Sequence, residues 1–431
     1  PAYYCTEPNG FMFVYLHALK HGVFERRDDF DWLCRNYIAG LPRNLSRAGN
    51  LSSDLDGYGI HRAWYGPVLV EGIPLEAAAL AEVLGLPELA GYCRWYVDRY
   101  MEFVKRRPTY AGSGLPEAQP YGHKINIEAQ FSQLASARFY GAIAPVEPPA
   151  YGSFAWEAGW LRISTPEYET SFAGHTCLRN IPVVPCYGDP NLGTLIGGAP
   201  LATLFSKNEL LYAASFPAAS LWHIELDDHN GRRFLSCSTS PEDDTSVTVR
   251  RSPDGAMLDS TAFDPYDTPC NLFLKDGEFL ELNWQRRDRA NRFDFYVHNR
   301  YHADRIELDF GLKGMAGHYC DRVTFVLPIP DETAEFQDAS GEFHPLAELS
   351  GLPEAIRWRR GNRTCLIDTL ELTGASGGAR LAVAVRKLPA DPGMPGGVNS
   401  FSPYSTSQVR FEVTPATDSR IWRLRCRLNF Q

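Results

Sequence analysis

The spacing of apolar residues changes once along this chain of 431 residues, at a short proline-rich segment. Before residues 144–150, APVEPPA, apolar side chains recur at helical spacing, and after them they alternate in short runs. Several prolines in seven residues suit neither the interior of a helix nor a central strand. The sequence therefore predicts an α+β protein of more than one domain, with a helical domain over residues 1–145 and antiparallel sheet over residues 150–431.

Five segments before the boundary have helical periodicity. Acidic residues open the second, proline opens the third and the fourth, and Gly85 follows the third, as is usual at helix ends. The predicted helices are Phe11–Phe24, Asp28–Ala39, Pro74–Leu84, Pro87–Arg106 and Ile125–Tyr140.

The segments after the boundary are short, alternate in polarity and are separated by turn-forming clusters such as DDHNG, SPDG and LKDG. Many short strands without intervening helices are typical of a large antiparallel β-sandwich. No fixed-period repeat is visible, which disfavours a propeller or a solenoid. The predicted strands are Trp160–Ser164, Leu221–Leu226, Ser246–Arg250, Phe279–Trp284, Phe293–Val297, Arg305–Phe310, Arg322–Leu327, Thr364–Leu372, Arg380–Arg386, Gln408–Val413 and Arg420–Leu428.

Composition limits the kind of partner. The net charge of −10 disfavours nucleic acid, because phosphate binding needs a basic surface. No apolar run approaches the roughly 20 residues that span a bilayer. The region near residues 35–62 nevertheless carries four arginines and few acids, which suits a small anionic group such as a carboxylate. We therefore expect an anionic partner, no nucleic acid and no membrane span.

The ten cysteines are widely spaced and form no CxxC pair, which argues against a zinc ribbon or finger and leaves buried thiols or a few disulfides. Sequons occur at Asn44, Asn50 and Asn362, and the chain starts at Pro1 without a methionine or a signal peptide. We expect a processed or truncated chain that is secreted or periplasmic. No cofactor is predicted, and the carboxylates leave a structural Ca²⁺ open.

The linker Leu41–Glu71 between two predicted helices has the richest mixture of side chains. A connection of this length inside a compact domain is typically functional or disordered, and aromatic residues argue against disorder. Turn formers alone would suffice for a structural loop, yet the linker also holds histidine, arginine and aromatic residues: Arg43, Asn44, Arg47, Asn50, Asp54, Asp56, His61, Arg62, Trp64 and Tyr65. We interpret it as the wall of an active site.

One element of this linker has the outline D-G-x-x-x-H-x-x-x-Y, given by Asp56, Gly57, His61 and Tyr65. With helices before it and a large β region after it, the chain resembles the polysaccharide lyases of the α/α-toroid plus β-sandwich type, such as hyaluronate and chondroitin AC lyases. That family places its Tyr further from its His. The resemblance implies β-elimination served by a His and a Tyr beside an Asn and an Arg. Five helices are too few for a complete toroid, so the toroid is partial here or is completed by further sequence.

The chemistry of elimination assigns roles to the linker. The C5 proton of a uronic acid becomes acidic only when the adjacent carboxylate is neutralised, which an Asn or Arg can do by hydrogen bonding. A His or Tyr can then take the proton, and a Tyr can return one to the leaving oxygen. We assign His61 as the base, Tyr65 as the base or acid, and Arg62 and Asn50 as the neutralising groups.

Other residues are candidates for holding the substrate. Trp64 and Arg47 lie in the same linker, Tyr121 and His123 belong to the segment PYGHKINIE, and His175 ends YETSFAGH. Further tryptophans that could stack on sugar rings are Trp32, Trp95, Trp156 and Trp160.

Two other functions remain open. A glycoside hydrolase of similar architecture would use paired carboxylates, drawn from Asp54, Asp56, Glu71 and Glu128. A non-catalytic carbohydrate-binding protein would bind through its sandwich and leave the His/Arg/Tyr linker unexplained. No G-x-S-x-G nucleophile elbow between a strand and a helix is found, and H-E-x-x-H, the P-loop and the Rossmann fingerprint are absent from the sequence.

Overall fold

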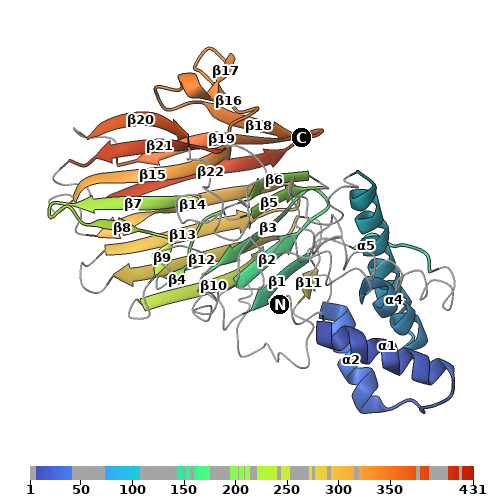
Figure 1. Ribbon diagram of the computed structural model, residues 1–431. Helices are drawn as coiled ribbons and strands as arrows, with labels where there is room; N and C mark the ends of the chain where they lie inside the picture. Colours follow the sequence, from blue (N-terminus) through green and yellow to red (C-terminus); the bar gives the residue numbers. More distant parts are fainter. Residues whose placement is uncertain are drawn as a thin grey trace, which may run out of the picture. The chain divides into compact units, whose positions relative to one another are not determined.

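The computed structural model shows four helices and a set of antiparallel strands in the part of the chain that it describes (Figure 1). The residues described are 6–40, 73–106, 143–148, 151–155, 160–174, 195–201, 203–207, 209–213, 221–239, 244–252, 271–273, 277–288, 293–314, 320–374, 379–387, 406–416 and 420–431.

The chain divides into two compact units. Unit 1 comprises residues 1–153 and 261–273, and unit 2 comprises residues 154–260 and 274–431. Unit 1 contains the helices α1 (Thr6–Lys20), α2 (Asp28–Gly40), α4 (Ile73–Val83) and α5 (Pro87–Arg106). It also contains β11 (Asn271–Phe273), which pairs with residues 151–153 of β1 (Tyr151–Ala155).

Helix α4 is the centre of the helical core. Its alanines, residues 77–79 and 81, and Leu80 are at most 2% exposed, so that α4 is buried around its circumference over this stretch. Small side chains let the neighbouring helices approach closely. Leu16 of α1, Ile38 of α2 and Tyr96 of α5 belong to the same cluster of buried residues.

Local hydrogen bonds end one helix and start the next. Gly85 adopts φ +75°, and the N–H of Leu86 donates to the Ala81 carbonyl over 2.8 Å, which closes the end of α4. Pro87 then starts α5. At the start of α2, Asp31 accepts from Tyr15 of α1 (2.7 Å) and from Arg26 (2.5 Å), which fixes α2 against α1.

Unit 2 is built on one nine-stranded antiparallel sheet, with the order β10-β12-β13-β14-β22-β19-β18-β16-β17. Its strands are β10 (Asp244–Ser252), β12 (Phe279–Asp288), β13 (Phe293–Tyr301), β14 (Arg305–Gly314), β22 (Ile421–Phe430), β19 (Arg363–Thr373), β18 (Ala355–Arg360), β16 (Glu335–Gln337) and β17 (Phe343–Pro345).

A second sheet, with the order β20-β21-β15-β7-β8, contains β20 (Arg380–Lys387), β21 (Thr406–Thr414), β15 (Cys320–Pro330), β7 (His223–Asp228) and β8 (Arg233–Leu235) (Figure 1). The strands β2 (Trp160–Ser164), β3 (Glu169–Ala173), β5 (Thr203–Ser206) and β6 (Glu209–Ala213) pair in that order, and β4 (Leu195–Ile196) pairs with β9 (Ser238–Thr239). A 3₁₀ turn, η11 (Leu346–Glu348), follows β17.

Aromatic residues on one face of the nine-stranded sheet pack against the other strands of unit 2 or donate hydrogen bonds to them. Phe310 of β14 meets Phe325 of β15 edge to face, with ring centroids 5.7 Å apart. The indole N–H of Trp284 on β12 donates to the Gly174 carbonyl after β3, and that of Trp358 on β18 donates to the Leu211 carbonyl of β6. These contacts make unit 2 a sandwich with an aromatic core.

The large antiparallel β region predicted from the sequence is confirmed. Every strand pairing recorded among the described residues is antiparallel, and the described part of residues 220–340 contains no helix. Four of the five predicted helices are present, and the fifth, Ile125–Tyr140, lies outside the described residues. The four helices do not establish an α/α toroid, which stays a prediction, as do the boundaries 1–145 and 150–431.

Candidate functional site

The predicted site residues lie outside the described part of the chain. This holds for the catalytic candidates His61, Tyr65, Arg62 and Asn50 and for the carboxylates of the hydrolase alternative. It also holds for the substrate-binding candidates, which are Trp64, Arg47, His123, Tyr121 and His175. Their roles therefore remain predictions.

The structure does describe the two ends of the 41–71 linker. Helix α2 ends at Gly40 and α4 begins at Ile73, so the linker connects two helices of one core, as the sequence predicts. Arg35 on α2 donates from Nη2 to the Leu84 carbonyl just after α4, over 2.9 Å. This arginine, one of the four near the linker, is occupied in joining α2 to the end of α4.

The described tryptophans are mostly core residues. Trp222, Trp284, Trp358 and Trp422 are each less than 2% exposed. Of the stacking candidates, Trp95 is 9% exposed and Trp32 is 43% exposed, whereas Trp64 and Trp156 lie outside the described residues. Trp32 is therefore the more exposed of these two side chains.

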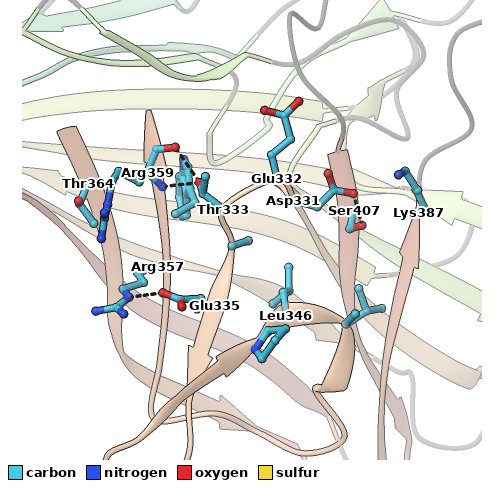
Figure 2. Close-up of a pocket in the computed structure, with 15 residues that line it drawn as sticks. Asp331, Glu332, Thr333, Glu335, Leu346, Arg357, Arg359, Thr364, Lys387 and Ser407 are labelled. Atoms are coloured by element: carbon cyan, nitrogen blue, oxygen red, sulfur yellow. Dashed lines mark hydrogen bonds and ion pairs between the residues drawn. The ribbon is translucent and has the colours of Figure 1, made fainter. Parts of the chain in front are cut away.

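Unit 2 contains a cavity of about 790 Å³ beside the short strands β16 and β17. Figure 2 shows that its walls come from several segments: the turn after β15, the strands β18, β19, β20 and β21, and η11. Its volume is in the range of small-molecule sites, about 300–1,000 Å³. Its lining residues are Asp331, Glu332, Thr333, Ala334, Glu335, Pro345, Leu346, Ala347, Arg357, Trp358, Arg359, Thr364, Val385, Lys387 and Ser407.

The three acidic residues of this cavity each have a partner. Ser407 donates to Asp331 over 2.8 Å, and Arg357 donates from Nε to Glu335 over 2.7 Å, both visible in Figure 2. Arg360, adjacent to the cavity, donates to Glu332 over 3.3 Å. These pairs limit the positions that the three acidic side chains can take.

Thr333 fixes the turn to β18 by two hydrogen bonds. Its hydroxyl donates to the Arg359 carbonyl (2.7 Å) and accepts from the Arg359 N–H (2.9 Å). Beneath this turn, Ala334, Leu346 and Trp358 are 6%, 3% and 1% exposed. The cavity thus has a charged rim above three almost fully buried apolar side chains.

A different charged cluster lies on one face of the β20-β21-β15-β7-β8 sheet. Arg410 of β21 donates to Glu225 of β7 from Nη1 (3.1 Å) and Nη2 (2.6 Å), and the two residues are 4% and 7% exposed. Burial by itself raises the pKa of Glu225, but the hydrogen bonds from His223 and Arg410 outweigh it and hold that pKa far below its usual range. The charged groups of this cluster pair with one another and stabilise the sheet.

The cysteines in the described residues are buried free thiols: Cys34, Cys93, Cys237, Cys320, Cys365 and Cys426. Burial raises the pKa of Cys34, Cys93, Cys237 and Cys320 to about 12, so they stay protonated at neutral pH. Inert thiols of this kind are packing residues. The described residues also contain no group of three or more His, Cys, Asp or Glu placed to hold a metal ion.

Sequence reasoning missed the cavity of unit 2. Its acids do have a local signal, the run Asp331–Glu332–Thr333, which begins four positions after the end of the predicted strand Arg322–Leu327. The other walls come from strands up to 76 positions away in sequence, as Ser407 is from Asp331. Only the strand order brings them together.

No protein-family model matches the sequence, and no curated protein matches it. Among solved structures, the chain is similar to a heparinase III with a TM-score of 0.39 and 9% identity, covering 93% of this chain and 54% of that one. It is similar to the α-galactosidase from Lactobacillus brevis with a TM-score of 0.32 and 12% identity, covering 63% and 39%. For the α-N-acetylgalactosaminidase from Bifidobacterium bifidum the TM-score is 0.30 and the identity 12%, covering 55% and 34%.

The chain thus spans about half the length of the heparinase III it matches. At TM-scores this low the likenesses carry no argument for a particular activity. None of the described helices is long and apolar enough to cross a membrane.

Proposed function

We propose that this protein is a polysaccharide lyase that cleaves a uronic-acid-containing polysaccharide by β-elimination. One observation carries the proposal: the linker of residues 41–71 concentrates His61, Arg62 and Tyr65 between two helices, α2 and α4, of a single packed core. Anchored ends limit the conformations of a connection, and a helical core is a rigid support for catalytic side chains.

In the proposed reaction His61 takes the C5 proton of the uronic acid, with Tyr65 as the alternative base. The C5–H electron pair forms the C4=C5 double bond as the C4–O bond breaks, and Tyr65 gives a proton to the leaving oxygen. Arg62 and Asn50 hydrogen-bond the substrate carboxylate and stabilise the charge that develops on it. No water is consumed, so the product carries an unsaturated ring.

The proposed substrate is an anionic polymer, and further residues of the sequence are assigned to holding it. Trp64 and Tyr121 present rings to sugar faces, Arg47 offers a positive charge, and His123 and His175 offer hydrogen bonds. A secreted or periplasmic location agrees with such a substrate and belongs to the same proposal.

The test is to incubate the full chain with a panel of uronate polysaccharides and to follow ultraviolet absorbance and reducing ends together. A lyase raises both, because each cleavage creates one unsaturated ring and one reducing end. Reducing ends without absorbance would establish hydrolysis instead, with Asp54 or Asp56 among the catalytic carboxylates.

A further inference from the structure

A further pocket of unit 2 lies on the face of the nine-stranded sheet that points away from the aromatic core. Its walls come from four adjacent strands, β13, β14, β22 and β19, and its volume is about 320 Å³. Along β22 the side chains of Leu424 and Cys426 are buried, whereas those of Arg423, Arg425 and Arg427 are partly or largely exposed. Because successive side chains of a strand point to opposite faces, the three arginines lie on the outer face. We call this space the outer-face pocket.

Three charged residues form a row across the outer-face pocket. Asp309 of β14 and Glu371 of β19 are the register partners of Arg425 on its two sides, and all three line the pocket. Arg425 lies 3.6 Å from each carboxylate, which is longer than an N–H···O hydrogen bond. Asp309 accepts instead from Nε of Arg423, over 2.7 Å. Arg425 and Glu371 are therefore a donor and an acceptor side by side, 47% and 66% exposed, that are not hydrogen-bonded to each other.

A β-bulge in β19 places Glu371 in this row. Between residues 368 and 371, β19 has two residues, Thr369 and Leu370, opposite a single residue of β22. In a regular pairing Leu370 would stand opposite Arg425, and Glu371 would point toward the core. Thr369 has a φ of +51°, which is unfavourable for a β-branched residue. Bulges of this kind re-aim side chains, and here the bulge brings Glu371 beside Arg425 in spite of the local strain.

The charges at this pair decide which ligand fits. Arg427, the next outward arginine of β22, is occupied by Asp368 over 2.9 Å. The groups left to a ligand are Arg425 and Glu371, whose charges cancel. A simple anion would be repelled by the carboxylate of Glu371, and a simple cation by the guanidinium of Arg425. A neutral ligand that accepts from one group and donates to the other satisfies both, and a hydroxyl can do either. Two hydroxyls on adjacent carbons of a sugar ring match a donor and an acceptor placed side by side.

We propose that the outer-face pocket is a non-catalytic sugar-binding site in which Arg425 and Glu371 hold two neighbouring ring hydroxyls. The requirement for paired hydroxyls rests on the pocket alone. That the sugar belongs to the polymer that the protein cleaves rests on the proposed lyase function. A second contact of this kind retains a polymer between cleavage events, because it acts at high effective concentration.

The test measures how fast phenylglyoxal modifies Arg425, by mass spectrometry of the full chain. The probe is methyl cellotetraoside, a neutral sugar without the uronic acid that a lyase requires. At ten times its half-saturating concentration it should slow the modification of Arg425 about 10-fold, since roughly a tenth of the sites remain free. It should not slow the modification of Arg386, an exposed arginine outside the pocket.

Two control compounds separate paired hydroxyls from other features of the probe. The first is the same tetrasaccharide after periodate cleavage and borohydride reduction, which leaves hydroxyls but none on adjacent ring carbons. The second is sodium acetate, which offers a carboxylate alone. Neither should slow the modification of Arg425. Equal protection by either compound, or no protection by the intact sugar, would overturn the proposal.

A pair of variants tests the acceptor. Glu371→Ala should raise the half-saturating concentration for protection of Arg425 about 10-fold, the loss expected for one hydrogen bond to a charged group. Glu332→Ala, which removes an acid of similar exposure outside the pocket, should leave it unchanged. An unchanged modification rate of Arg386 in both variants shows that they remain folded. An unchanged half-saturating concentration in Glu371→Ala would contradict the assignment of this residue.

The two proposals fail separately. Protection of Arg425 without formation of unsaturated product from any uronate polymer would reject the lyase and keep this site. Unsaturated product without protection would do the reverse.

Discussion

The two units use charged residues in different ways. In unit 2 the described arginines are largely joined to acids across strands, as in Glu225–Arg410, Asp309–Arg423 and Asp368–Arg427. In unit 1 the ion pairs of the described residues lie near helix starts or along one helix, and the residues with the most varied chemistry follow one another in the linker 41–71. Charge in the sheets therefore maintains structure, whereas charge in the linker is the candidate for chemistry.

This contrast predicts a separation of effects. Substitutions in the cross-strand pairs should lower stability and leave the chemical step of the folded fraction unchanged. Substitutions in the linker should lower activity and leave stability nearly unchanged.

The largest effect is expected for Arg410→Ala. It would leave the buried carboxylate of Glu225 without its main partner, and removing one member of a buried pair typically costs about 3–5 kcal/mol. Urea unfolding followed by fluorescence measures this loss.

The matched control for that change is Arg386→Ala on the neighbouring strand β20. Arg386 pairs with Glu412 over 3.3 Å, but its side chain is 60% exposed, so the expected loss is at most about 1 kcal/mol. Equal losses of unfolding free energy in Arg410→Ala and Arg386→Ala would show that burial does not determine how much an ion pair contributes. The double change Glu225→Gln with Arg410→Met should recover much of the loss, because no unpaired buried charge remains.

The next effect concerns activity. His61→Ala and Tyr65→Phe should each lower kcat about 100-fold or more, which is about 2.7 kcal/mol of transition-state stabilisation, with little change in Tm. Arg62→Ala should mainly raise KM by removing attraction to the substrate carboxylate. Steady-state kinetics on the best polymer of the panel measures both.

The hydrolase alternative predicts another pattern for the same set. Asp54→Asn or Asp56→Asn would be the most damaging change, and Tyr65→Phe would be tolerated. Full activity in both His61→Ala and Tyr65→Phe would show that these two linker residues are not catalytic. His123 and His175 would then be the next candidates.

The third effect is a pH dependence of stability. Because the pKa of Glu225 is lower in the folded chain than in the unfolded chain, this group stabilises the fold above its unfolded pKa. That stabilisation is lost as pH falls through the acidic range toward the folded pKa. Glu225→Gln should therefore flatten the decline in unfolding free energy below about pH 4.5, the ordinary pKa region of glutamate. An equally steep decline of the unfolding free energy at acid pH in this variant would contradict a lowered pKa of Glu225 in the folded chain.

The smallest effect is expected for Arg357→Ala at the cavity. The Arg357 and Glu335 side chains are 31% and 39% exposed, and the guanidinium carbon lies 3.5 Å from the Phe343 ring centroid. An exposed pair and an exposed cation–π contact together contribute about 1 kcal/mol. Thermal unfolding should show a small decrease, and a loss as large as that of Arg410→Ala would remove the distinction between open and buried pairs.

How much the sequence could predict differs between levels of structure. The helical and alternating patterns located α2, α4 and α5 and most long strands, because apolar periodicity is a local property. Short strands such as β5 and β6 were not predicted. Lys207 follows β5 with a φ of +50°, a conformation that usually requires glycine, so no glycine marks this turn in the sequence. A toroid depends on how helices are arranged around an axis, which periodicity does not specify.

The charged pairs between strands could not be predicted from local sequence either. Glu225 and Arg410 are 185 positions apart, and only the pairing of β15 with both β7 and β21 brings their strands together. The linker could be proposed as a site because its residues are consecutive, so no strand order was needed to recognise it.

Elimination and hydrolysis break the same glycosidic bond but leave different products. The most direct measurement is a mass spectrum of the products formed in water enriched in the heavy isotope of oxygen. Elimination predicts fragments with a new non-reducing end lighter by one water and with no heavy oxygen incorporated into the cleaved linkage. Fragments that have gained one labelled water at the cleavage point would contradict the account.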